Sequence, residues 1–445
     1  MLYRLHNYYL IFGLLLIGFL AVMTIERAFC SVSLVTLFAY VSQMLLIIRF
    51  LRDKGVYYTS RSLFWTVLLY NLLLATIIVV FSSFYGGEKF LLSDADAVLY
   101  YKEGLRSTDL GFIGNTKRIA KKWPSDDWGA LVFSAFMMNI IPSRFFVNAF
   151  YIFTGAVSSW MLFYISKSVM PIKYAFIAAL AYGTSSYLIL FHCTFLKESL
   201  FLFIIISAVY CFYKSIIDGR HGYLLGVVLC LTCIVFFRPV VAAFLIMSFF
   251  SYYAITQKGA VSLFLYLIIA GVLVVSFAFL QELSDHYTAG GDTDVILAES
   301  SSHNYSGSFN FFVGWFSALF GPFPTLFPKS NPMPMNLYGA GLVYKAFLII
   351  PFWIGVLFAV LRWNVRLFPV MVFVLVEMAA SAVVLASFEL RKVVLHMPFI
   401  YVVSFYGLSR LSKSNFSESF KTLIEFGSYG FAIGTLFLWT VIRVK

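Results

Sequence analysis

The run LLGVVLCLTCIVFF, residues 224–237, is followed at once by Arg238 and Pro239 and then by a second apolar run that ends near residue 256. Proline has no N–H and suits the first turn of a helix, so the break between two helices is predicted at Pro239. An arginine this deep in apolar sequence needs a partner or a cavity, because an unpaired charge is costly next to hydrocarbon. The stretch therefore predicts two membrane helices joined at a charged turn.

The whole chain has the same character, since 61% of its 445 residues are hydrophobic and 12% are charged. This composition excludes an ordinary soluble domain, and the long apolar runs are unlike the short alternating segments of a β-barrel. The first run, near 8–22, lacks a cleavage site and is interpreted as a retained helix. The predicted fold class is all-α, a polytopic transmembrane helical bundle of about thirteen spans. The spans are expected near 8–25, 31–48, 62–84, 143–165, 172–192, 196–213, 222–237, 239–256, 261–280, 343–361, 367–387, 394–409 and 422–441.

The short loops indicate the orientation of the bundle. The basic loop 49–54 is assigned to the cytoplasm together with the amino terminus, because Lys and Arg collect in cytoplasmic loops. The alternate short loops agree, and their cations are Lys167, Lys173, Lys214, Arg220, Lys258, Arg362, Arg366, Arg410, Lys413 and Lys421. Two long loops, 85–142 and 281–342, then lie on the outer face and separate three groups of helices, 1–84, 143–280 and 343–445. Long loops in compact proteins are usually functional.

The first long loop carries the densest acidic stretch beside a predicted span, SDADAVLYYKEG at 93–104. Asp94 and Asp96 could cap a helix, where a Ser or Asp and an acidic first turn are favoured. They could equally be catalytic carboxylates on the outer face, and two carboxylates could hold a divalent cation such as Mg²⁺ or Mn²⁺. The loop also has a basic excess that suits either a solvated surface helix or a site for anionic lipid headgroups. Nucleic acid is not indicated, because basic residues are scattered between the spans.

No Walker loop, GxGxxG, HExxH or paired GxSxG motif occurs, so ATP-driven and serine-hydrolase chemistry have no support. Charged residues do occur at predicted outer ends of helices, namely the pair Lys197-Glu198 and the single Arg238. Lys197 and Glu198 could merely extend to the interface. Arg391 could bind a phosphate with both of its terminal nitrogens, which a lysine cannot do.

Several of these motifs, taken in order, resemble the GT-C superfamily of polytopic glycosyltransferases over residues 85–410. Asp96-Ala97-x-x-Tyr100-x-x-x-Gly104 resembles the DAxxYxxxA motif of the first outer loop, with Gly104 in place of alanine. LKESL at 196–200, Phe237-Arg238-Pro239, GPFP at 321–324 and ELRKVVLHMP at 389–398 resemble further elements of bacterial members that build surface polysaccharides. The acidic loop follows the third span here and usually follows the first in the family.

The resemblance implies a glycosyltransferase of the bacterial cytoplasmic membrane that works on its outer, periplasmic face. The donor would be a sugar or oligosaccharide on polyprenyl phosphate or pyrophosphate, and the acceptor a glycan or glycolipid. Asp96 or Asp94 would take the proton of the acceptor hydroxyl. The groups expected to bind substrate are Tyr100, Lys102, Lys197, Glu198, Arg238 and Arg391.

Two other functions remain open on the sequence. A repeat-unit polymerase or ligase of O-antigen or capsule assembly would use the same donor class. A flippase or transporter of lipid-linked oligosaccharides would need polar residues in the middle of its helices, whereas this chain keeps nearly all its charges at helix ends.

Overall fold

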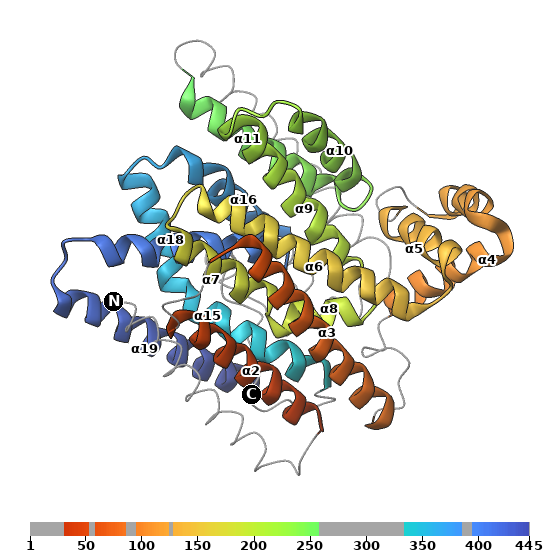
Figure 1. The fold of residues 1–445 in the computed structure, drawn as a ribbon, viewed down its shortest axis with the longest axis horizontal. Coiled ribbons are helices and arrows are strands. Elements are labelled where there is room, and N and C mark those ends of the chain that lie inside the picture. Colours follow the sequence, from red (N-terminus) through yellow and green to blue (C-terminus); the bar gives the residue numbers. More distant parts are fainter. Residues whose placement is uncertain are drawn as a thin grey trace.

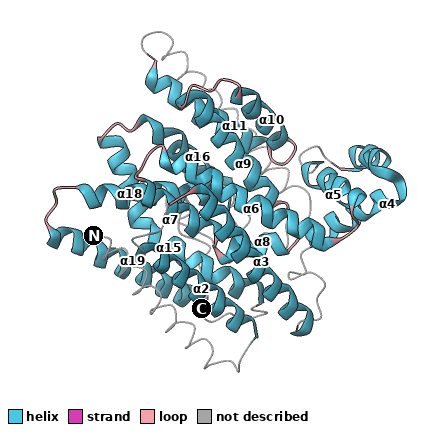
Figure 2. Ribbon diagram, viewed as in Figure 1, coloured by secondary structure: helices cyan, strands magenta, loops and turns pink. Residues whose placement is uncertain are grey.

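The computed structural model describes residues 31–52, 58–85, 95–123, 128–257, 333–384 and 394–444. This part of the chain is helical and has no strand (Figures 1 and 2). The helices are α2 (Ser31–Arg52), α3 (Ser60–Tyr85), α4 (Ala95–Lys122), α5 (Trp128–Ile140), α6 (Arg144–Lys167), α7 (Ile172–Gly183), α8 (Ser186–Cys193), α9 (Glu198–Phe212), α10 (Tyr223–Val235), α11 (Pro239–Thr256), α15 (Met333–Leu361), α16 (Phe368–Val384), α18 (Met397–Lys413) and α19 (Glu418–Val444). Short π or 3-10 turns lie at Tyr213–Ile217, Val365–Leu367 and Val394–His396.

The prediction of an all-α chain with membrane-spanning helices is confirmed at this level. Five described segments are long and apolar enough to cross a bilayer: Ser60–Val80, Arg144–Lys167, Glu198–Ile217, Pro239–Thr256 and Val394–Lys413. The predicted spans 8–25 and 261–280 lie outside the described residues. The predicted span 172–192 is two helices, α7 and α8, which are separated at Thr184 and Ser185. The total of about thirteen spans stays a prediction.

Helix α18 forms the centre of the bundle. It packs against α15, α7 and α16, and most of the residues in the membrane-length segment Val394–Lys413 are buried. Gly407 on α18 and Gly355 on α15 let the two backbones touch, because a Cβ at Gly407 would collide with the Pro351 carbonyl oxygen, and one at Gly355 with that of Val403. Small residues allow such close approach of membrane helices, where dispersion and polar contacts replace the hydrophobic effect.

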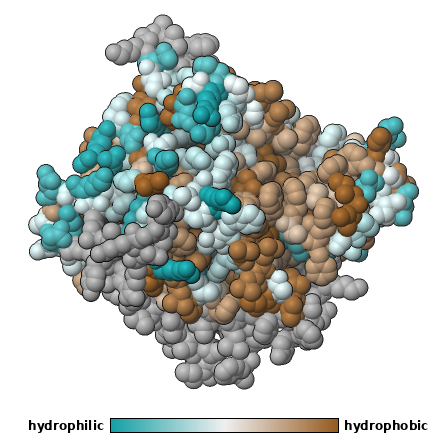
Figure 3. Space-filling model, in the orientation of Figure 1, coloured by the Kyte–Doolittle hydropathy of each residue, from teal (hydrophilic) through white to brown (hydrophobic). Residues whose placement is uncertain are grey.

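The outer helices expose apolar side chains that a soluble protein would bury. Leu69 and Leu73 on α3 are 61% and 57% exposed, and Leu225 on α10 is 66% exposed. In Figure 3 a broad apolar surface covers the side of α3 and α5, and hydrophilic side chains gather toward the opposite side, near α11 and α18. Apolar surface of this extent is stable against lipid.

Helices α4 and α5 form a separate projection from the bundle (Figure 1). Helix α4 is kinked at Gly111, whose φ of 68° breaks the helix, so that its second half folds back toward its first half. Asn115 Nδ2 donates to the Glu103 carbonyl oxygen across the kink at 2.7 Å. Helix α5 packs along α4. The first long loop of the sequence prediction is therefore largely helical.

Candidate functional site

The α8–α9 turn places two charged residues at the end of the bundle nearest the α4–α5 projection. Phe195 turns the backbone with a φ of 60°, a conformation that costs a non-glycine residue about 1–3 kcal/mol. Its ring is fully buried and contacts Tyr101 of α4 at 5.8 Å and Tyr151 of α6 at 6.5 Å between centroids. This packing offsets the backbone strain and fixes the direction in which Lys197 and Glu198 leave the turn.

Two hydrogen bonds hold the same turn from inside the bundle. His192 Nδ1 and Ser199 Oγ lie 2.8 Å apart and are both buried. Asn148 Nδ2 of α6 donates to the carbonyl oxygen of Cys193 at 3.2 Å. The turn is therefore tied to α6 on one side and to the start of α9 on the other, which gives a rigid base for a site.

The first turn of α4 lies over the α8–α9 turn. Asp96 is partly buried in this turn of the helix, and Tyr100, one turn later on the same face, is 4% exposed. The Lys197 ammonium lies 6.0 Å from the centre of the Tyr100 ring, within range of a cation–π contact. Asp96 is close enough to Glu198 for their negative charges to repel.

The α10–α11 turn adds the third segment of the site. Arg238 leads into α11, with Pro239 in the first helical turn as the sequence predicts. Its Nη2 lies 4.0 Å from Glu198 Oε1, and its guanidinium lies 6.0 Å from the centre of the Phe201 ring. Arg238 was predicted to need a partner or a cavity, and its partner is Glu198, which is 2% exposed. The idea that Glu198 merely extends to the interface is wrong, because its carboxylate is buried.

The α10–α11 turn is also docked against α5. The Gly129 amide donates to the Phe236 carbonyl oxygen at 2.8 Å, and Trp128 stacks on Phe236 at 6.2 Å. A Cβ at Gly129 would collide with the ring of Phe237, which itself stacks on Phe201 at 5.3 Å. These contacts connect the α4–α5 projection to the turn that carries Arg238.

The convergent cluster consists of Asp96, Tyr100, Lys197, Glu198 and Arg238, which come from three separate parts of the sequence. Within the described residues, neither carboxylate oxygen of Glu198 accepts a hydrogen bond from another residue. The attraction of Arg238 and Lys197 and the repulsion by Asp96 act on this carboxylate together. A buried carboxylate beside two partly exposed cations holds those cations in place, and cations placed in this way attract an anionic ligand.

The other candidate residues do not join this cluster in the described structure. Lys102 is exposed on α4, and because it lies six positions after Asp96, the two side chains are separated by about 120° around the helix axis. Asp94 and Arg391 lie outside the described residues, as do the GPFP motif at 321–324 and the second long loop.

A metal site at the cluster is not supported by the residues that can be placed. Among the described residues no group of three or more His, Cys, Asp or Glu side chains could hold a metal ion. Asp96 and Glu198 are oxygen donors, but Lys197 and Arg238 already supply positive charge beside them. Asp94, the predicted partner of Asp96 in holding a divalent cation, lies outside the described residues.

Arg144 and Tyr151 are neighbours of the site that the sequence motifs did not indicate. Arg144, the first residue of α6, interacts electrostatically with Tyr101 and lies near Cys193. Tyr151 is 2% exposed and close enough to Glu198 for an electrostatic interaction. A cation that begins a helix at the end of a long loop is a signal that the sequence offers for Arg144. No such signal exists for Tyr151, which reads as an ordinary core aromatic.

Three basic residues of the first long loop have a structural role of their own. The carboxylate of Glu103, which is 2% exposed, forms ion pairs with three cations. They are Arg106 at 2.6 Å, Arg118, and Lys122 at 3.7 Å. This network closes the α4 hairpin across its kink. Lys117 and Lys121 remain exposed on its surface.

Comparison of the chain with protein families, with curated proteins and with solved structures gives no match. The geometry of the cluster therefore carries the functional argument by itself.

Proposed function

We propose that this protein is a membrane glycosyltransferase that moves a sugar or oligosaccharide from a polyprenyl phosphate or pyrophosphate carrier to a hydroxyl of a glycan or glycolipid acceptor. The observation that carries the proposal is the convergence of Asp96, Tyr100, Lys197, Glu198 and Arg238 at one end of the bundle. The convergence unites three motifs that in sequence lie up to about 140 residues apart, and it supplies both a carboxylate and cations at one place.

The chemistry of transfer needs those two kinds of group. Asp96 accepts the proton of the acceptor hydroxyl, and the oxygen of that hydroxyl forms a bond to the anomeric carbon of the donor sugar. The bond from that carbon to the phosphate oxygen breaks, and the electron pair leaves with the phosphate. Lys197 and Arg238 stabilise the negative charge that develops there.

Glu198 has a different role from Asp96 in this scheme. Its buried carboxylate lies 4.0 Å from Arg238 Nη2 and attracts Lys197, so it orients the phosphate-binding cations. The Tyr100 ring beside Lys197 offers a flat aromatic face for the same ammonium. Glu198 and Tyr100 are therefore positioning residues, and Asp96, Lys197 and Arg238 would touch the reacting groups.

The location of the cluster agrees with a lipid-linked substrate. It lies at one end of the apolar bundle, where α4 and α5 project from the helices (Figure 1). A carrier lipid could keep its chain in the bilayer while its phosphate reaches the end of the bundle. On the predicted topology this is the periplasmic side of the cytoplasmic membrane.

The proposal is tested with purified protein in lipid vesicles that contain a polyprenyl-phosphate-linked sugar and a candidate acceptor. Wild-type protein should consume the donor and release the carrier phosphate, and a deletion strain should lose part of its surface glycan. Product with many repeat units would instead assign a polymerase. Transbilayer movement of an unchanged lipid-linked sugar, with no transfer, would assign a flippase and overturn the proposal.

A further inference from the structure

A pocket of about 280 Å³ lies where the α6–α7 turn meets the last turns of α18. Its eight lining residues are Lys167, Ser168, Val169, Met170, Pro171, Ser409, Arg410 and Lys413. Three of them are cations, and none is a carboxylate. The pocket is distinct from the cluster described above, because Arg144 at the other end of α6 is 23 residues, or about 35 Å of helix, from Lys167.

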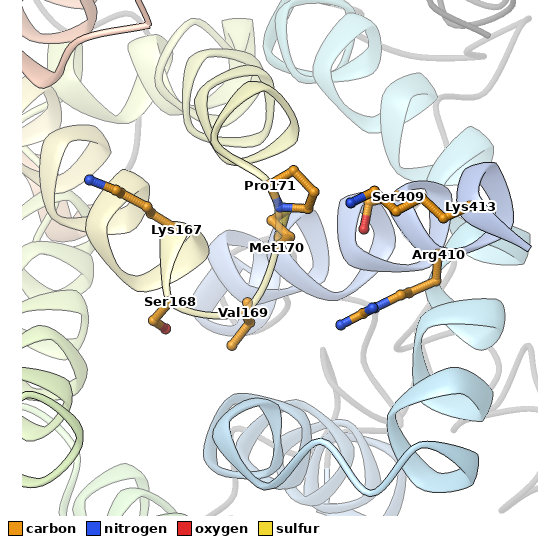
Figure 4. A pocket seen from close by; sticks show the side chains of 8 residues that line it. All are labelled: Lys167, Ser168, Val169, Met170, Pro171, Ser409, Arg410 and Lys413. Carbon is orange, nitrogen blue, oxygen red and sulfur yellow. The ribbon is translucent and has the colours of Figure 1, made fainter.

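Two of the cations extend into the space between α18 and the turn. Figure 4 shows Arg410 and Lys413 reaching from one face of α18 toward the Ser168–Pro171 turn, whereas the Lys167 ammonium is directed away from them. Arg410 and Lys413 are three positions apart and therefore neighbours on the helix. Their positive charges together favour an anion in this space.

The Arg410 side chain has a restricted direction and an unsatisfied donor, and both features favour an anion. Its guanidinium lies 5.0 Å from the centre of the Tyr406 ring, one turn earlier on α18, which restricts its direction. Among the described residues its buried Nε has no hydrogen-bond partner. A buried donor without an acceptor is costly unless a ligand or water supplies the acceptor.

The remaining polar groups of the pocket are already used. Ser168 Oγ donates to Ile165 O at 2.6 Å and Ser409 Oγ donates to Tyr406 O at 2.8 Å. The backbone amide of Ser168 bonds within the turn as well. Recognition therefore falls to the guanidinium and the ammonium, a pair that suits a phosphate group, with Arg410 able to bind two oxygens.

We propose that this pocket binds a phosphate group, at the end of the bundle opposite the Asp96 cluster. The inference does not depend on the proposed glycosyl transfer. Two sources have this chemistry: the headgroup of an anionic phospholipid and a soluble phosphate or pyrophosphate. The sequence topology assigns both the α6–α7 turn and the end of α18 to the cytoplasmic side, where basic pockets between helices bind anionic headgroups.

The test measures binding by wild-type protein in neutral detergent, as the shift of its melting temperature during titration. The probes are phosphatidylglycerol, phosphatidylcholine as the zwitterionic reference, and inorganic pyrophosphate. Tighter binding of phosphatidylglycerol than of phosphatidylcholine, without binding of pyrophosphate, identifies a lipid headgroup. Binding of pyrophosphate, with or without the lipid, identifies a soluble phosphate. The double variant Arg410→Gln/Lys413→Gln should bind at least about tenfold more weakly, because two charge-assisted contacts are lost.

Arg362→Gln is the matched control, since Arg362 is an exposed cation at the end of another helix and is not part of the pocket. It should bind as wild type does. Arg410→Lys should be intermediate, because the charge stays and the two-oxygen contact is lost. If the double variant does not fold, the single variants Arg410→Gln and Lys413→Gln carry the comparison. The inference would be overturned if wild type binds neither phosphatidylglycerol nor pyrophosphate, if binding survives the loss of both cations, or if Arg362→Gln loses binding equally.

Discussion

The pair formed by Arg238 and Glu198 allows a quantitative test of the cluster. Arg238→Gln removes the guanidinium that lies 4.0 Å from Glu198 Oε1, and it leaves a 2% exposed carboxylate that accepts no hydrogen bond from another described residue. Two unit charges at this distance attract by about 4 kcal/mol at an effective dielectric constant of 20. The Arg238 side chain is 29% exposed, so solvent screens part of this attraction.

We therefore expect Arg238→Gln to lower the free energy of unfolding by about 2–4 kcal/mol, toward the low end of what breaking a buried pair costs. Glu198→Gln should cost less, about 1 kcal/mol or below, because the amide is neutral and the exposed side of Arg238 stays solvated. In the double variant the carboxylate is gone, so the loss of Arg238 should cost little more. The predicted interaction energy is about 1–3 kcal/mol.

The assay is reversible unfolding of the four proteins of this double-mutant cycle in one detergent at one salt concentration. Raising the salt concentration should reduce the interaction energy only slightly, because buried pairs are screened weakly. Strictly additive effects of the two substitutions would show that the charges do not interact. The assignment of Glu198 as the residue that positions Arg238 would then be refuted.

Three further predictions concern packing and topology. Gly129→Ala should displace the Phe237 ring and destabilise the protein by about 1–3 kcal/mol, which the melting temperature measures. It should also slow sugar transfer, because Arg238 is the residue after Phe237. An unchanged transfer rate would argue against coupling between α5 and the site. Gly407→Val should separate α18 from α15 and lower the melting temperature strongly. Gly427→Val is the control and should have a much smaller effect, because a Cβ at Gly427 meets open space. Equal effects would contradict the close crossing of the two helices. The topology is tested by single cysteines in a variant without its native cysteines, with a thiol reagent that cannot cross the membrane. A Cys at exposed Thr108 should react in intact cells, whereas a Cys at Lys413 should react only after permeabilisation. The reverse pattern would place the Asp96 cluster in the cytoplasm.

The sequence predicted the helices because their apolar runs are long and end at charges or prolines. Arg238-Pro239 shows this well, since Pro239 does begin α11 and Arg238 does have an acidic partner. The identity of that partner could not be predicted, because Glu198 lies 40 residues away and only the packing of α9 against α10 brings the two together. Periodicity gives the face of a helix but not its neighbour.

Local deviations of the backbone were equally hidden. The kink of α4 at Gly111 and the left-handed Phe195 depend on tertiary contacts that override local preference. Gly104 stands where the resembled motif has alanine, and here a Cβ would lie 3.1 Å from the Ser134 carbonyl oxygen of α5. The close packing of α4 on α5 favours glycine at this position, but the sequence alone does not show which helix is the neighbour.

The central claim is that Asp96 is the base of a glycosyl transfer, and one comparison tests it most directly. Asp96→Asn keeps the size of the side chain but removes the group that accepts the proton. Asp109→Asn is the matched control, because Asp109 is an exposed carboxylate on the same helix. The measurement is the rate of sugar transfer from a polyprenyl-phosphate-linked donor by the two variants and wild type, reconstituted in equal folded amounts. Asp96→Asn should be slower by about 10²–10⁴-fold, the usual contribution of a general base, and Asp109→Asn should match wild type. Near-normal transfer by Asp96→Asn would contradict the catalytic role and leave Asp96 as a charged residue in the first turn of α4.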